Sequence, residues 1–165
     1  MMIFTDGSFS NQPKMCGIGI IVLDGKKKYE FGAYTEKCKD NNIAEIYAIA
    51  YALKQISENR IFKENADKHL IIMTDSMYAV NKIKNNQLGR DELEQKALDY
   101  IQYTIKQSKK TVSLFQMKGH TNDNTKLGYY NNLADQLAND YRFHGLVKYQ
   151  DQIFRMTLKK KEKRR

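Results

Sequence analysis

The stretch CGIGIIVLDGKKKYEFGAYT, residues 16–35, decides the fold because it predicts two paired strands. Its first part, residues 16–23, is a continuous apolar run with two glycines, which is typical of a buried strand. Asp24-Gly25 is a strong signal for a hairpin turn, and residues 28–35 alternate well enough to be the returning strand. We therefore expect an antiparallel hairpin as the first part of a sheet.

Around this hairpin, the chain alternates between strand-like and helix-like patterns. Three short apolar runs predict further strands: residues 2–5, 69–74 and 111–117. Helical spacing or a helix start predicts four helices: residues 43–56, a segment after Asp75-Ser76, residues 91–107 and residues 131–143. The first strand should end in a turn at Asp6-Gly7-Ser8, and Asn41 or Asn42 should cap the first helix. The order βββαβα(α)βα predicts an α/β fold, a five-stranded mixed sheet with helices packed on its faces.

The composition is that of one soluble domain. A chain of 165 residues with 41% hydrophobic content can bury a core. No apolar run approaches the ~18 residues of a membrane span, and the start lacks a secretion signal, so we expect a cytoplasmic protein with no membrane partner. Cys16 and Cys38 are too few for a disulfide framework or a zinc site. They favour two buried thiols, which lie near each other if their segments pair as strands.

The net charge of +9 is spread unevenly. Residues 159–165 hold six basic residues and one acid, so this tail supplies +5 and the rest of the chain only +4. Binding of a polyanion and a solvated, disordered terminus both explain such a tail. We expect a domain at residues 1–145 and a C-terminal extension at residues 146–165 that ends in this basic tail.

Four acidic residues occupy positions where a site could form. Asp6 and Asp75 directly follow apolar strands, and the end of a buried strand borders the crevice where α/β folds place their sites. Either residue could equally cap the next turn or helix. Glu45 and Asp135 lie near the starts of helices, where an acid also favours the helix dipole. Taken singly, none of the four requires a function.

The motifs around these acids are more specific than the acids themselves. TDGS, NNIAE, TDS, KGH and NxxAD occur in this order, and they resemble the type 1 ribonuclease H family from about residue 3 to residue 139. The resemblance implies the ribonuclease H-like fold, with three antiparallel strands, then parallel ones, and helices on both faces. It also implies a catalytic, metal-binding set of four residues: Asp6, Glu45, Asp75 and Asp135.

The resemblance further implies an endoribonuclease that hydrolyses the RNA strand of RNA–DNA hybrids by two-metal-ion catalysis, leaving 5′-phosphate and 3′-hydroxyl ends. Crowded carboxylates repel one another when ionised, so they favour hard divalent cations with oxygen ligands. Two Mg²⁺ ions, with Mn²⁺ as a substitute, would activate a water and stabilise the leaving oxygen. Asp6 is the candidate to bridge both ions. Glu45 and Asp75 would complete the shell of one ion, and Asp135 would serve the other.

Other positions of the family pattern carry over to this chain. His120 in KGHT matches a histidine that assists proton movement or product release, and an ordinary histidine pKa near ~6.5 suits that role. The candidate contacts to the hybrid are Gln12, Asn41, Asn42 and Asn131. In similar enzymes, the 2′-hydroxyl distinguishes RNA from DNA across the minor groove.

The chain also departs from the family pattern. His120 and Asp135 are further apart than is common, which predicts an extended loop at residues 122–129. The stretch between Asp75 and His120 lacks the Trp- and Lys-rich helix that many bacterial members use to hold substrate. Our hypothesis is that the basic tail compensates for it. Met77 stands where a polar base-reading residue is common.

Three rival interpretations remain. A DNA-cutting resolvase of the same fold would lack the NNxxE and KGHT motifs, and a binding module without catalysis has no physical reason to keep four mutually repelling acids. A nuclease portion of a larger polyprotein is the third. The starting methionine favours a free-standing protein, which we expect to be a monomer.

Overall fold

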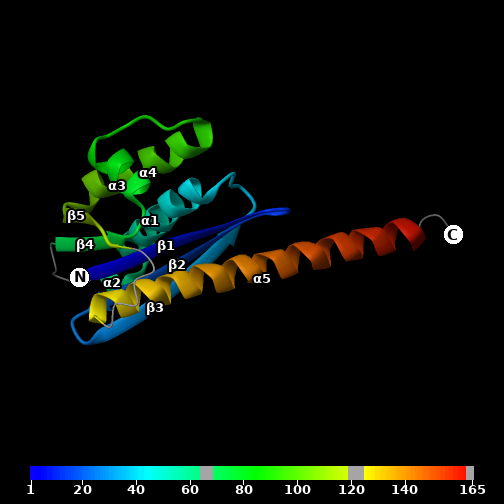
Figure 1. Cartoon of the computed structure of the whole chain (residues 1–165), viewed down its shortest axis with the longest axis horizontal. Coiled ribbons are helices and arrows are strands. Elements are labelled where there is room, and N and C mark those ends of the chain that lie inside the picture. The colour runs from blue at the N-terminus through cyan, green and yellow to red at the C-terminus, as the bar shows by residue number, and fades with distance from the viewer. Residues whose placement is uncertain (64–68, 119–124, 163–165) are drawn as a thin grey trace.

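Five strands form one mixed sheet in the computed structural model, which describes residues 1–63, 69–118 and 125–162. The sheet order is β3-β2-β1-β4-β5. The strands are β1 (Met2–Asn11), β2 (Lys14–Asp24), β3 (Lys27–Thr35), β4 (His69–Thr74) and β5 (Thr111–Gln116). Strands β1, β2 and β3 pair antiparallel, whereas β4 pairs parallel with both β1 and β5. The predicted sheet, hairpin included, is confirmed (Figure 1).

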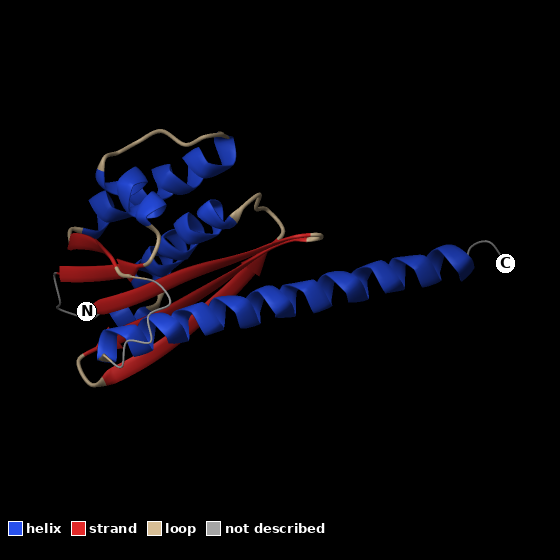
Figure 2. Cartoon of the chain, viewed as in Figure 1, coloured by secondary structure: helices blue, strands red, loops and turns tan. Residues whose placement is uncertain are grey.

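Helices cover both faces of this sheet (Figure 2). They are α1 (Asn41–Glu58), α2 (Arg60–Lys63), α3 (Met77–Lys84), α4 (Glu92–Ser108) and α5 (Lys126–Glu162). One face lies under α1, with α3 and α4 beyond it, and α5 crosses the opposite face. Side chains alternate along β1, so Ile3 faces the core under α1 whereas Phe4 packs with Ala134 of α5. The first strand therefore separates two cores.

The turn expected at Asp6-Gly7-Ser8 was wrong. Strand β1 runs through these residues and pairs with β2 from Met2 to Asn11, which places Asp6 opposite Gly19. The apolar run ends at Thr5, but the backbone of the long β2 strand continues to supply hydrogen-bond partners beyond it. Asp6 consequently lies in the interior of the sheet.

The expected caps of α1, Asn41 and Asn42, were also wrong. The cap is Asp40, whose Oδ1 accepts a hydrogen bond from the backbone N–H of Ile43 at 3.0 Å. A carboxylate at this position satisfies one of the free N–H groups of the first turn. The two asparagine side chains are thereby left for other contacts.

Helix α5 is much longer than the predicted 131–143. It begins at Lys126, so residues 126–129 of the expected loop are helical, and it continues without a break to Glu162. Its docked half packs closely on β2, since a Cβ at Gly17 would lie 2.0 Å from the carbonyl oxygen of Ala138. No proline or glycine interrupts residues 146–162, and the helix continues through them. It therefore includes the first part of the basic tail, for which disorder was one of the two explanations.

The two cysteines lie in a small buried cluster with Ile43 and Ala44. Both are free thiols, and their side chains are hydrogen-bonded to each other. The expected proximity of Cys16 and Cys38 is confirmed. It follows from the pairing of Cys16 with Thr35, which brings the chain after β3 back beside β2.

A buried carboxylate, Glu94, ties α3 and α4 to the start of α1. Its side chain is fully buried, and it accepts hydrogen bonds from the Tyr78 hydroxyl at 2.5 Å and from Arg90 Nε at 2.6 Å. Arg90 also pairs with Asp40, the cap of α1, at 2.9 Å. Burial alone would raise the pKa of Glu94, but the hydrogen bonds from Tyr78 and Arg90 outweigh it and lower the pKa.

We expect Glu94→Ala to lower the free energy of unfolding by about 3 kcal/mol, because it leaves Arg90 and the Tyr78 hydroxyl without their acceptor. The contribution of the Glu94 carboxylate should be present above its unfolded pKa. It should disappear as pH falls through the lower folded pKa. Urea unfolding at neutral and acidic pH measures both effects. Glu92→Gln is the control, because its side chain is 82% exposed. Equal losses from the two variants would contradict this role of Glu94.

Candidate active site

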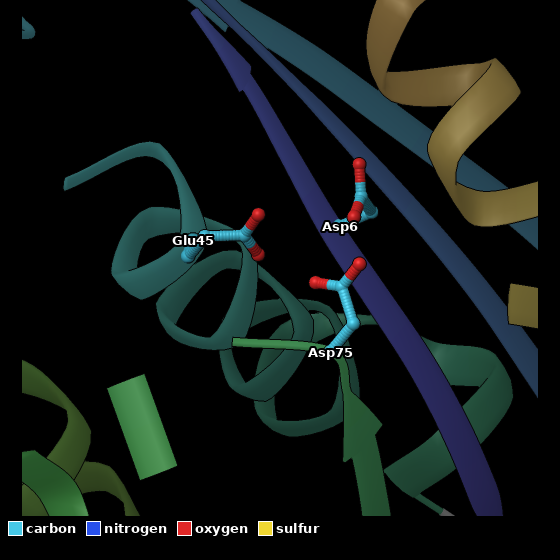
Figure 3. Close-up of side chains that lie close together, drawn as sticks. All are labelled: Asp6, Glu45 and Asp75. Atoms are coloured by element: carbon cyan, nitrogen blue, oxygen red, sulfur yellow. The ribbon is translucent and has the colours of Figure 1, made fainter. Parts of the chain in front are cut away.

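Three of the four predicted carboxylates converge at one point. Asp6, Glu45 and Asp75 each offer an oxygen within 4.8 Å of the others. They come from the middle of β1, from the first turns of α1 and from the residue after β4 (Figure 3). Segments far apart in the sequence thus supply one cluster of acids.

The sheet register places Asp75 beside Asp6. Strands β1 and β4 pair in parallel up to Phe4 and Met73, so two residues further along each strand lie Asp6 and Asp75. The chain leaves the sheet there because the side chain of Ser76 caps α3, accepting from the N–H of Ala79 at 3.1 Å. Past this point β1 is paired with β2 only, and Asp6 lies beside the end of β4.

Gly7 allows α1 to approach β1 closely enough to bring Glu45 to the site. A Cβ at Gly7 would lie 2.3 Å from the carbonyl carbon of Ala44 and 2.5 Å from the nitrogen of Glu45. The backbone N–H of Gly7 donates a hydrogen bond to the Glu45 carboxylate. Our sequence interpretation took this glycine for a turn residue and missed its role. Its place directly after Asp6 in the TDGS motif was the available signal.

The carboxylates strongly perturb one another. Burial, followed by the charges of Asp75 and Asp135, raises the pKa of Asp6 to about 8. Burial, followed by the charges of Asp6 and Asp75, raises the pKa of Glu45 well above its ordinary value, although the Gly7 N–H opposes the shift. Asp6 therefore holds a proton at neutral pH unless positive charge enters the site.

The donor set fits a hard divalent cation. The Oε2 atom of Glu45 is buried and has no hydrogen-bond partner among the described residues. Its Oε1 atom accepts a long hydrogen bond, 3.5 Å, from Asn41 Nδ2. A buried carboxylate oxygen without a partner carries a large desolvation cost. A cation held by Asp6, Glu45 and Asp75 would offset that cost with the oxygen ligands that Mg²⁺ prefers.

Asp135 lies beside this cluster on α5, and its side chain is hydrogen-bonded to that of Asp6. It also accepts from Asn139 Nδ2 at 3.1 Å, and Asn139 Oδ1 in turn accepts from the Ser8 hydroxyl at 2.7 Å. Sequence analysis missed Ser8 and Asn139. The four-residue spacing from Asp135 to Asn139 puts both on one helix face and was a usable signal.

The remaining predicted residues differ in their surroundings. Gln12 is exposed in the turn between β1 and β2, and Asn41 is exposed at the start of α1, with Asn42 half-buried beside it. Asn131 is only 4% exposed, and its Oδ1 has no hydrogen-bond partner among the described residues. His120 lies outside the described residues.

The chain matches the model of the RNase H family over residues 1–142. It belongs to the ribonuclease H family. Among curated relatives, a ribonuclease H of Caldicellulosiruptor saccharolyticus is 30% identical over 149 residues, which cover 84% of this chain and 92% of the relative. A ribonuclease H of Thermoanaerobacter sp. is 28% identical over 148 residues, which cover 84% and 86%. The family resemblance seen in the motifs is confirmed, and the chain is an enzyme of the ribonuclease H type.

Solved structures agree in fold. LC11-RNase H1, isolated from compost, superposes with a TM-score of 0.67 at 21% identity, covering 88% of this chain and 96% of that one. The same enzyme in complex with an RNA/DNA hybrid gives a TM-score of 0.69 at 20% identity, covering 88% and 98%. At these identities the likeness establishes the ribonuclease H fold. Within the described part of this ribonuclease H, no helix combines the length and apolarity needed to cross a membrane.

Proposed function

We propose that this ribonuclease H hydrolyses the RNA strand of RNA–DNA hybrids by two-metal-ion catalysis with Mg²⁺, for which Mn²⁺ can substitute. The observation that carries the proposal is the convergence of Asp6, Glu45 and Asp75, with one Glu45 oxygen buried and unpartnered among the described residues. Buried acids that repel one another are costly to bring together, and binding of divalent metal supplies compensating positive charge.

Each carboxylate has a distinct part in this proposal. Asp6, Glu45 and Asp75 would hold one cation, and Asp135, which is hydrogen-bonded to Asp6, would serve a second that Asp6 shares. When bound, the cations supply an activated water and stabilise the leaving 3′ oxygen, so the products carry 5′-phosphate and 3′-hydroxyl ends.

The surrounding residues keep these carboxylates in place. The N–H of Gly7 orients Glu45, and Asn139, held by Ser8, orients Asp135. Because the pKa values of Asp6 and Glu45 are raised, these groups release protons when cations bind, and metal affinity should rise with pH. His120 is proposed to move a proton or assist product release.

The hybrid is proposed to contact the end of the molecule where the β1–β2 turn and the start of α1 lie. Gln12 and Asn41 are exposed there, and both offer amide groups that can donate to a 2′-hydroxyl or a sugar oxygen. Asn42 and the buried Asn131 complete the proposed contacts. The RNA/DNA hybrid bound by LC11-RNase H1, a protein of the same fold, supports this choice of substrate. The domain boundary at residue 145, the monomeric state and the cytoplasmic location stay predictions.

The proposal is tested with labelled RNA–DNA hybrid, single-stranded RNA and double-stranded DNA, each with and without Mg²⁺ or Mn²⁺. We expect cleavage of the RNA strand of the hybrid alone, only with metal, and abolished by Asp75→Asn. Product ends are assigned by their response to phosphatase and to 3′-end extension. Cleavage of duplex DNA would instead favour the resolvase, and binding without cleavage would favour the binding module.

A further inference from the structure

One face of α5 changes its chemistry where the helix leaves the sheet. Ala134, Ala138, Tyr141 and Gly145 recur every three or four residues and therefore share this face. A Cβ at Gly19 would lie 2.1 Å from the Ala134 carbonyl oxygen, and one at Gly32 would lie 2.0 Å from the Tyr141 ring. A Cβ at Gly145 itself would lie 2.7 Å from Met15 and Tyr34. This face is thus the one that packs on β2 and β3.

The same spacing continues beyond Gly145 with polar and basic residues. The next positions are Lys148, Gln152, Arg155 and Lys159, which we call the basic face. Lys148 and Arg155 are exposed. A repeat of seven residues drifts by only ~20° per heptad on a straight helix, so the basic face remains on the side that packs on the sheet upstream. The residues of this face that pack on the sheet are uncharged, and three of the four that follow beyond the sheet are basic.

The docked half of α5 directs this face toward the proposed substrate side. Arg142 Nη1 donates to the carbonyl of Phe9 at 3.4 Å, and Asn139 accepts from Ser8, so the helix is attached to β1 close to the β1–β2 turn. Beyond it, α5 continues past the tip of that hairpin, at the same end of the molecule as the entry of the chain into α1 (Figure 1). Residues 146–162 extend for roughly 25 Å, about three quarters of a duplex turn.

Charge is concentrated in this extension. Residues 146–165 hold eight of the 28 basic residues and two of the 19 acidic ones, so they carry +6 of the net +9. Elsewhere, the segment between α3 and α4 has one basic residue, Arg90, and that guanidinium is already engaged by Asp40 and Glu94. The extension therefore offers a duplex that reaches past the active site more cations than the segment between α3 and α4 does.

We propose that the basic face of α5 binds the phosphate backbone of the substrate duplex where it extends beyond the active site. This inference rests on the proposed function and adds where the same duplex is held. The contacts would release counterions without reading bases, so they should raise affinity for long duplexes and make it depend on salt.

The extension also has exposed apolar side chains, which would suit a second copy of this chain. Val147, Ile153 and Met156 are 41%, 49% and 61% exposed. Pairing two copies through these residues would bring together two extensions that each carry +6, which opposes association. Charge therefore favours a polyanion over a second copy as the occupant.

The test compares three full-length proteins in an Asp75→Asn background, which separates binding from cleavage. They are the parent, the basic-face variant (Lys148→Gln, Arg155→Gln and Lys159→Gln), and a control that removes three lysines elsewhere (Lys26→Gln, Lys27→Gln and Lys106→Gln). Binding of hybrids of about 24 and about 8 base pairs, more than two turns and less than one turn, is measured across a range of salt.

We expect the basic-face variant to bind the long hybrid about 10- to 100-fold more weakly at low salt, with a slope of log K against log salt that is shallower by about 3. The short hybrid should bind equally to all three proteins. An unchanged slope for the long hybrid, or an equal loss in the control, would overturn the proposal. The proposal would also be overturned if sedimentation showed that the protein is a dimer and that Ile153→Gln with Met156→Gln converts it to a monomer.

Failure of the proposed function would look different. If protein with Asp75 intact leaves hybrids uncut but the basic-face variant still lowers the salt slope, the proposed function fails and the duplex-binding face stands. If hybrids are cut and the slope does not change, only the inference about α5 fails.

Discussion

Asp6→Asn should abolish cleavage of the hybrid and at the same time stabilise the metal-free protein. Asp6 is the proposed ligand shared by both cations, and an amide in its place has neither the charge nor the second anionic oxygen. We expect kcat to fall by roughly 10³-fold or more, equivalent to at least about 4 kcal/mol in the barrier. Loss of activity would then accompany a gain in stability.

The gain follows from the raised pKa of Asp6. Folding lifts this pKa from 3.8 to about 8, so between these values the folded protein binds a proton that the unfolded chain has lost. The free energy of unfolding therefore falls as pH rises through this window. Asparagine removes the effect, and the variant should exceed the wild type by up to about 5 kcal/mol near pH 8, with little difference near pH 4.

Urea unfolding with a chelator present, at pH 4 and pH 8, measures the stability, and the hybrid assay measures the activity. Asp99→Asn is the matched control, because Asp99 is exposed on α4 and should leave both quantities unchanged. A less stable Asp6→Asn protein at pH 8 would show that the carboxylates do not repel one another as the structure indicates.

Gly7→Ala should damage both stability and catalysis. Its new Cβ would lie 2.3 Å from the backbone of Ala44, and neither a strand nor a helix backbone can yield locally. Helix α1 would have to move away from β1 and take Glu45 with it. We expect a loss of about 3 kcal/mol in the free energy of unfolding. Displacement of a metal ligand by ~1 Å should also lower kcat about 100-fold.

Gly25→Ala is the control for this substitution. Gly25 lies in the β2–β3 turn with a φ of +60°, and a Cβ there would meet no atom within 4 Å. Only the cost of the left-handed backbone remains, about 1 kcal/mol. Hybrid cleavage should stay at the wild-type rate. If Gly7→Ala behaved like Gly25→Ala, the close approach of α1 to β1 would not be needed for cleavage.

Local patterns in the sequence were enough to predict the order of strands and helices and the acids that meet. Strand β4 matches its predicted bounds, His69–Thr74, because a short apolar run between polar segments has few alternatives. The motifs then predicted that Asp6, Glu45 and Asp75 lie together, because these residues match the catalytic positions of the ribonuclease H family. The positions of these residues could be predicted without any knowledge of side-chain contacts.

Features that depend on distant partners could not be predicted in this way. The length of β1 is set by its pairing with β2, and the apolar run alone ends too early. Nothing in the local sequence distinguishes Glu94 from the acids beside it, yet it is buried and contacts Arg90, Lys82 and Tyr78. The bond from Ser8 to Asn139 joins residues 131 positions apart. Such contacts exist only once the chain has folded.

Because α5 is one unbroken helix, the orientation of its docked half fixes the direction in which each side chain of its free half points. The docked half cannot rotate, because its backbone lies directly on Gly17 and Gly19. Each residue added or removed between Gly145 and Lys148 turns the free half by about 100°. The number of residues at this junction therefore decides which side of the free half faces the duplex, whatever those residues are. Homologues with an extension of this kind can vary in sequence there far more easily than in length.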